Sequence, residues 1–228
     1  PHCEKTLDLA KTKHGATMFT YLCGKCGEEF DVLGTMENLK KATPFSDRFD
    51  EGKNFCNKVW NGVRFALMNL GELSYAPLSH SDLASEDRWI LSRLSRAVAS
   101  VDSQLNDYNP SAAVTAARDF FWGELCDWYL ELIKPRMKED ADAASGQAAR
   151  QVLATTLDQA LRLLHPFVPF LTETLWGPLG AQAPTRGVES ELPSSELCLT
   201  AAWPTATPAW EDDAVEAEYQ TLRDVIRK

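Results

Sequence analysis

Long hydrophobic runs are absent from this chain of 228 residues. No apolar stretch approaches the ~20 residues that a membrane-spanning helix needs, and no signal peptide heads the sequence. Hydrophobic residues make up 44% of the chain and charged residues 25%, which is ordinary for a globular protein. We therefore expect no membrane association, and one large domain or two small ones with a substantial core.

Positive charge is also scarce. The formal net charge is −10 at pH 7, which argues against broad, non-specific binding of nucleic acid. Any RNA-binding function must therefore come from a local patch. The six cysteines comprise one tight pair and four single residues, which is not the pattern of a disulfide framework. Metal binding together with reduced thiols fits better and points to the cytoplasm.

Catalytic motifs are missing as well. The sequence has no Gly-rich phosphate loop, no HExxH motif and no nucleophile elbow. Of its four histidines, His165 precedes a proline, and we interpret it as a helix-end residue rather than a base. The carboxylates are spaced as on solvated helix faces. We expect that this chain by itself catalyses nothing.

The first motif that is present is a pair of cysteines in the turn-rich stretch CGKCG. Zinc ribbons bring two such pairs, about 15–20 residues apart, to one tetrahedral ion. Cys3 stands at that kind of distance before Cys23 and Cys26. These features favour a structural zinc site over the alternative, a redox-active pair. The partner of Cys3 would fall just before Pro1, so we expect that the fourth ligand has been cut away and that zinc binds more weakly without it.

After residue 43 the sequence changes to long helical periods. The predicted helices begin near Ser46, Ser85, Pro110, Ala148 and Trp210. Prolines at 166 and 169 should break the fourth helix, which would be followed by a final turn through Trp176. The stretch DADAASGQAA before it is interpreted as a solvent loop. We interpret the aromatic run at 120–122, with Trp128 and Tyr129, as core rather than as a cofactor site.

The sequence therefore predicts an all-α fold, a bundle of four to five helices preceded by a small zinc-ribbon-like knuckle. We divide the chain into four parts. They are a knuckle at 1–36, the helical bundle at 43–180, an irregular connection at 181–209 and a C-terminal helix at 210–228.

The helix that contains NFCNKVWNGVRF carries the one locally positive region. Six basic and three acidic residues lie between Lys40 and Arg64. Opposite the apolar stripe, four polar side chains share one face: Lys53, Asn57, Asn61 and Arg64. Lys and Arg can contact phosphates, Asn can read base edges, and Trp60 or Phe65 can stack on unpaired bases. Spacing alone leaves an alternative open, an ordinary solvated face with the aromatic residues in the core.

Four strings in this order and spacing resemble the anticodon-binding region of the valyl-tRNA synthetase family: NFCNKVWNGVRFALMNL, DRWILSRL, FFWGELCDWYLELIKP and LRLLHPFVPFLTETLW. The resemblance covers roughly residues 46–180. The isoleucyl and leucyl enzymes share the general helical layout. The resemblance implies the anticodon-binding helical bundle of a class I tRNA synthetase, which holds the tRNA anticodon while the acceptor end is aminoacylated elsewhere.

The HIGH and KMSKS motifs, which bind ATP in the family's catalytic domain, do not occur here. The resemblance therefore implies ATP only in a missing catalytic domain. It also implies that a full-length valine-tRNA ligase attaches valine to its tRNA, a reaction that this chain supports but does not perform. The cysteine-rich start is similar to a zinc-ribbon insertion of some bacterial members. The last helix would lead toward a missing C-terminal coiled coil.

Carried over by position, the resemblance gives the RNA-binding candidates. Arg64 and Phe65 lead, Arg64 as a donor to phosphates or base edges and Phe65 as a stacking platform. The supporting candidates are Lys53, Asn57, Lys58 and Asn61. The implied partners are the anticodon region of valine tRNA and other domains of the same enzyme. The alternatives are an isoleucyl-type anticodon-binding domain, a helical adaptor that binds protein, and a redox module.

Overall fold

A computed structural model describes residues 47–226 apart from 72, 139 and 194, with side chains from residue 50 onward, and the backbone of short strands before that. The chain divides into two compact units, Pro1–Phe55 and Cys56–Lys228. In the first unit, β1 (Leu7–Asp8) pairs in parallel with β5 (Pro44–Phe45). An antiparallel sheet has the order β2-β3-β4 and comprises Lys13–Gly15, Met18–Leu22 and Glu29–Asp31.

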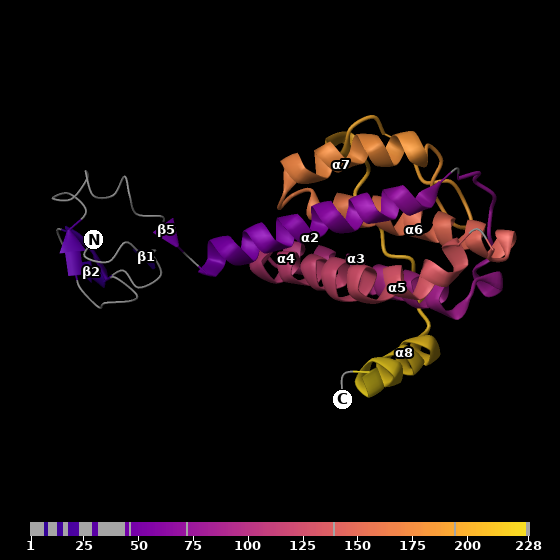
Figure 1. The fold of residues 1–228 in the computed structure, drawn as a ribbon, viewed down its shortest axis with the longest axis horizontal. Helices are drawn as coiled ribbons and strands as arrows, with labels where there is room; N and C mark the ends of the chain where they lie inside the picture. The colour runs from indigo at the N-terminus through magenta and orange to yellow at the C-terminus, as the bar shows by residue number, and fades with distance from the viewer. Residues whose placement is uncertain are drawn as a thin grey trace. The chain divides into compact units, whose positions relative to one another are not determined.

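The second unit is a helical bundle (Figure 1). Its helices are α2 (Asp47–Leu70, beginning in the first unit), α3 (Ser85–Asn106), α4 (Pro110–Asp119), the π-helix η3 (Phe120–Tyr129), α5 (Leu130–Ile133), α6 (Ala143–Leu164), α7 (Pro169–Gln182) and α8 (Asp213–Ile226). In the described part of this unit, four short 3₁₀ helices lie between them: η2 (His80–Asp82), η4 (Lys134–Met137), η5 (Cys198–Thr200) and η6 (Pro208–Trp210). Helix α3 packs on α4, α6 and α8, and α6 packs on α7. The predicted all-α bundle is confirmed. No helix among the described residues is both long and apolar enough to cross a bilayer.

Helix α6 lies at the centre of this bundle, and from Gln151 to Leu164 every residue is buried. A helix that is buried on all sides must pair its polar groups internally. The Asp158 carboxylate does so with two arginines: Arg162 Nε lies 2.7 Å from Oδ1, and Arg186 Nε lies 2.6 Å from Oδ2. Both guanidinium groups also stack on Trp176, at 5.2 and 5.0 Å from its ring centre. This cluster fastens the segment after α7 to the central helix.

The aromatic run lies in the π-helix η3. The interpretation as core is confirmed for Phe120, Phe121 and Tyr129, whereas Trp122 and Trp128 are half-buried. Phe121 and Tyr129 are fully buried. The Tyr129 hydroxyl donates a hydrogen bond of 2.7 Å to Asp87 of α3. On the side facing α2, a Cβ added to Gly62 would lie 2.7 Å from Cys126 Sγ, so a glycine is needed for α2 to approach η3 this closely.

Two expected boundaries are wrong, both at the ends of helices. Most of the stretch interpreted as a solvent loop, from Ala143 onward, belongs to α6. The helix begins there because Asp142 caps it by accepting a 2.7 Å hydrogen bond from the Ser145 backbone N–H. Helix α7 continues past the expected turn at Trp176 to Gln182, with Pro178 inside it. The break between α6 and α7 at the prolines is as predicted.

Candidate nucleic-acid interface

The apolar stripe of α2 orients its polar face. Val59, Val63 and Ala66 are fully buried, so the side chains on the opposite face of the helix point to solvent. This exposed row contains Asn57, Asn61 and Arg64, and Lys53 is exposed one turn earlier. The structure therefore places four of the six predicted RNA-binding residues on one open face.

The polar groups of the exposed row are unpaired within the described part of the chain. No hydrogen bond or ion pair engages the Asn57 and Asn61 amides or the Arg64 guanidinium. The Arg64 guanidinium lies 5.9 Å from the centre of the Trp60 ring, a cation–π distance. These donors and acceptors are free to bind a ligand.

An aromatic ring with a cation over it flanks the exposed row on each side. Trp60, with Arg64, is 37% exposed and lies toward α7. Phe65 is 38% exposed, and the ammonium of Lys134 lies 5.2 Å from its ring centre, on the side of η4. Because consecutive residues of a helix are rotated by about 100°, Arg64 and Phe65 face different sides. Both rings are partly exposed, and aromatic rings of this kind are platforms on which nucleic-acid bases stack.

Lys58 has a different position from the other candidates. Its ammonium forms a 2.6 Å ion pair with Asp127 of η3 and lies 5.5 Å from the centre of the Trp122 ring. The side chain is half-buried and its charge is already compensated. Lys58 therefore links α2 to the π-helix through this ion pair.

An open groove of about 300 Å³ lies between α2 and α7, on the Trp60 side of the row. Its α2 wall includes Trp60, Arg64 and Met68, and its α7 wall includes Pro178 and Gln182. Sequence reasoning missed the α7 residues, because no local pattern shows which helix packs beside α2. Figure 1 shows α7, in orange, running along α2.

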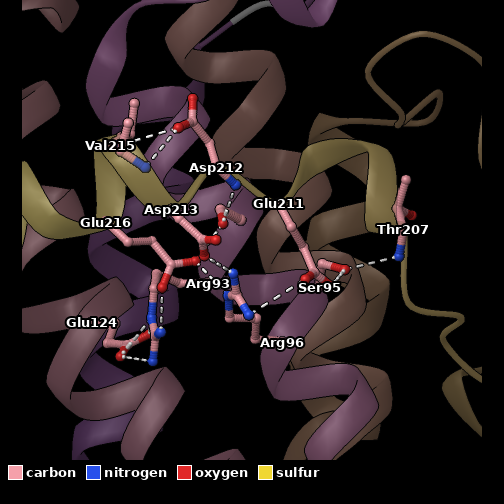
Figure 2. A network of polar contacts seen from close by, with 12 residues as sticks. Arg93, Ser95, Arg96, Glu124, Thr207, Glu211, Asp212, Asp213, Val215 and Glu216 are labelled. Atoms are coloured by element: carbon pink, nitrogen blue, oxygen red, sulfur yellow. Dashed lines mark hydrogen bonds and ion pairs between the residues drawn. The ribbon is translucent and has the colours of Figure 1, made fainter.

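A cluster of carboxylates lies where α8 docks on α3 (Figure 2). Arg93 binds both oxygens of Glu124 at 2.8–3.0 Å and also Glu216 of α8 at 2.8 Å. Burial alone would lower the pKa of Arg93, but its hydrogen bonds to Glu124 and Glu216 raise it overall. Burial opposes ionisation of Glu216 too, yet hydrogen bonds from Ser92, Arg93 and Arg96 hold the pKa of Glu216 below its usual value. Glu216 is therefore ionised at neutral pH and fixes α8 to α3.

Three other features bear on metal binding, thiol chemistry and the role of His165 in the described residues. No group of three or more His, Cys, Asp or Glu side chains among them could hold a metal ion. Burial raises the pKa of the Cys126 and Cys198 thiols to about 12, which keeps both thiols protonated and unreactive. His165 caps the end of α6, with its Nδ1 2.8 Å from Thr172 Oγ1, as expected for a helix-end residue.

The predicted zinc ligands Cys3, Cys23 and Cys26 lie outside the described residues. The zinc site therefore stays a prediction.

The chain is similar to known proteins along its whole length. The profile of the family described as "Anticodon-binding domain of tRNA ligase" matches residues 87–228. The valine-tRNA ligase of Rhodopirellula baltica is 36% identical over 99% of this chain, a match that includes α2 and covers 22% of that protein. The enzymes of Fervidobacterium nodosum and Thermotoga maritima are each 39% identical over 78% of this chain and 19% of their own length.

These matches confirm the resemblance that the sequence motifs indicated. The chain spans about a fifth of the length of the curated relatives it matches. The family profile covers α3 to α8 and therefore most of the helical bundle. The chain belongs to the family of anticodon-binding domains of tRNA ligases.

Proposed function

We propose that this chain is the anticodon-binding region of a valine-tRNA ligase and that it binds valine tRNA through the anticodon. The observation that carries the proposal is the exposed row of α2. In a chain of net charge −10, this row offers a guanidinium and two amides without described partners, between two partly open aromatic rings. Family membership and the valine-tRNA ligase relatives support valine tRNA as the RNA.

Each side chain of the row has a distinct role in the proposal. Arg64 donates to a phosphate or a base edge, and Phe65 is the platform for a base that has left the anticodon stack. Asn57 and Asn61 read base edges through their amides. Lys53 adds a phosphate contact, and Lys58 positions the helix through Asp127. Stacking tolerates any base, so selectivity comes from the amides and the arginine.

The chemical step belongs to the enzyme as a whole in this proposal. ATP-dependent attachment of valine takes place on a catalytic domain with its own ATP site, and the bundle contributes selection of the tRNA. A cytoplasmic location agrees with the free thiols of Cys56, Cys126 and Cys198. We also retain a zinc ion on Cys3, Cys23 and Cys26 as part of the proposal.

A binding titration tests the proposal directly. The 228-residue chain is titrated at low salt against valine tRNA, the same tRNA with a substituted anticodon, and isoleucine tRNA. We expect the tightest binding to unaltered valine tRNA and a loss of about 10- to 100-fold in an Arg64→Ala/Phe65→Ala variant, since one stacked base contributes about 1–3 kcal/mol. Equal binding of all three tRNAs would contradict anticodon recognition.

The matched control removes a cation and an aromatic ring elsewhere. Arg118→Ala/Trp203→Ala deletes an exposed arginine of α4 and a tryptophan that is 39% exposed, close to the 38% of Phe65. Neither residue lies on α2, so this variant should bind valine tRNA as the parent does. A similar loss in both double variants would indicate a general effect of charge or stability instead of a site on α2.

A further inference from the structure

We infer that the groove between α2 and α7 receives one unpaired base of the bound RNA, stacked on Trp60 and contacted at its edge by Gln182. This inference rests on the proposed function and gives the site a second wall that α2 alone does not supply. It also assigns a role in RNA recognition to α7, a helix that none of the six predicted residues occupies.

The two walls of the groove are built alike. Trp60, Arg64 and Met68 of α2 are spaced four residues apart, as are Thr174, Pro178 and Gln182 of α7. Residues at this spacing stack along one side of a helix. The two rows therefore face each other across a slot, and the buried side chains of Leu67 and Leu175 form its floor. A slot with long parallel sides suits a flat ligand.

The lining of the groove is apolar apart from a few polar groups. Trp60, Met68 and Pro178 supply exposed apolar surface, and Met68 is among the most exposed large apolar residues of the chain. Apolar walls with a small number of polar groups are typical of sites that bind flat organic ligands. A nucleobase has this character, because its faces are apolar and its edges carry donors and acceptors.

The charge of the groove selects an anionic ligand. No carboxylate lines it, and its one charged residue is Arg64, which has no ion pair with any described residue. A second groove, between α8 and α3, differs in this respect, because Glu124, Asp213 and Glu216 line it together with arginines. In a chain of net charge −10, a carboxylate-free groove with an unpaired guanidinium favours a base that carries a phosphate.

The polar end of the groove is formed by Gln182. It is the last residue of α7, it is exposed, and no described residue hydrogen-bonds its side-chain amide. A free glutamine amide presents a donor and an acceptor side by side and can pair with a base edge. Thr174 is less available as a donor, because its hydroxyl donates a 2.7 Å hydrogen bond to the Phe170 carbonyl.

A cycle of base and side-chain removal tests the inference. The probe is a synthetic stem-loop with the sequence of the valine tRNA anticodon arm, with each loop nucleotide in turn made abasic. For the parent chain, we expect one abasic position to weaken binding by about 10- to 100-fold. Trp60→Ala should weaken binding of the intact stem-loop by a similar factor. Combining Trp60→Ala with that abasic RNA should cost no more than either change alone, because both remove the same stack.

A second variant tests the edge contact. Gln182→Ala should reduce discrimination between bases at that same loop position and leave the other positions unchanged. Trp203→Ala is the control for loss of an exposed tryptophan, since its ring is 39% exposed against 37% for Trp60. Thermal unfolding of each variant, followed by circular dichroism, separates a lost contact from a lost fold.

The outcomes separate this inference from the proposed function. If Arg64→Ala and Phe65→Ala weaken binding while Trp60→Ala does not, the groove is not a base site. The proposed binding of RNA by the exposed row of α2 is then retained. If the Trp60→Ala and abasic losses simply multiply, the two changes act independently and the inference is overturned. If the parent chain binds no stem-loop at low salt, the proposed function fails first.

Discussion

Replacing Asp158 by asparagine should destabilise the bundle more than any other isosteric change we can name. The carboxylate is fully buried, and it is the one acidic partner of Arg162 and Arg186 among the described residues. Asp158→Asn keeps the volume and shape of the side chain. It removes the negative charge and places an amide donor against two groups that can only donate.

The magnitude follows from the two guanidinium groups that are left behind. Breaking a buried ion pair by removing one partner costs about 3–5 kcal/mol, because the remaining charge stays buried and uncompensated. Arg162 cannot easily swing into solvent, since it also donates hydrogen bonds of 3.0 Å to the Ala202 and Pro193 carbonyls. Arg186 is held in the same way by the Ala183 carbonyl at 2.7 Å. With two cations affected, we expect the upper part of the range, about 4–5 kcal/mol.

Urea unfolding of the parent and the variant measures this loss. For a bundle of this size, the expected loss corresponds to a decrease in melting temperature of about 8–20 °C. Limited proteolysis should also show earlier cleavage between residues 184 and 204, the segment that the cluster fastens to α6. Asp213→Asn is the control, because its side chain is 93% exposed and its ion pair with Arg96 should contribute at most about 1 kcal/mol. A loss below about 1 kcal/mol in Asp158→Asn would refute the assignment of this carboxylate as the counter-charge of both arginines.

Two further predictions concern the ends of the chain. Because the folded state lowers the pKa of Glu216 below its usual 4.5, its stabilisation of α8 should be complete above that pH and lost as pH falls through the folded value. The protection of the amides over 213–226 against hydrogen exchange, measured relative to the intrinsic rate at each pH, should therefore decrease in acid, and Glu216→Gln should show lower protection already at neutral pH and lose most of the acid dependence. An unchanged acid response in this variant would place the titrating group elsewhere. For the first unit, mass spectrometry of the native chain should detect bound zinc that Cys23→Ser loses, whereas a disulfide between Cys23 and Cys26 without zinc would support the redox alternative.

Local sequence patterns were sufficient for most of the helices. Helix α4 begins at Pro110, as predicted. The structure adds that Asn109 caps it, because the Asn109 side chain accepts a hydrogen bond from Ala112 N–H at 3.1 Å. The apolar period of α2 identified the buried stripe and therefore the exposed row. The start of α6 was missed because its first turn reads Ala-Ala-Ser-Gly, which resembles a loop. Its Asp142 cap was the available indication.

Local sequence patterns could not predict contacts between segments that are far apart in the chain. Lys58 has the same spacing whether it faces RNA or protein, so its ion pair with Asp127, 69 residues further along the chain, could not be predicted from that spacing. The groove beside Trp60 likewise depends on α7, which lies more than a hundred residues away in sequence. The sequence places Asp158 on a predicted helix, but it does not show that Arg186 is its partner. Arg186 comes from the segment that follows α7.

The acidic composition of the chain need not oppose RNA binding, because charge is distributed unevenly over the bundle. The carboxylates of Glu124, Glu211 and Glu216 are held by the arginines of α3. On α2 the arrangement is reversed, since Arg64 is left without a carboxylate partner among the described residues. Phosphates that approach this face meet the Arg64 guanidinium, which no described carboxylate compensates, whereas the carboxylates of Glu124, Glu211 and Glu216 are already compensated by arginines. Binding should therefore weaken as salt rises, with a shallow slope set by the few cations of one helix rather than by the net charge of −10.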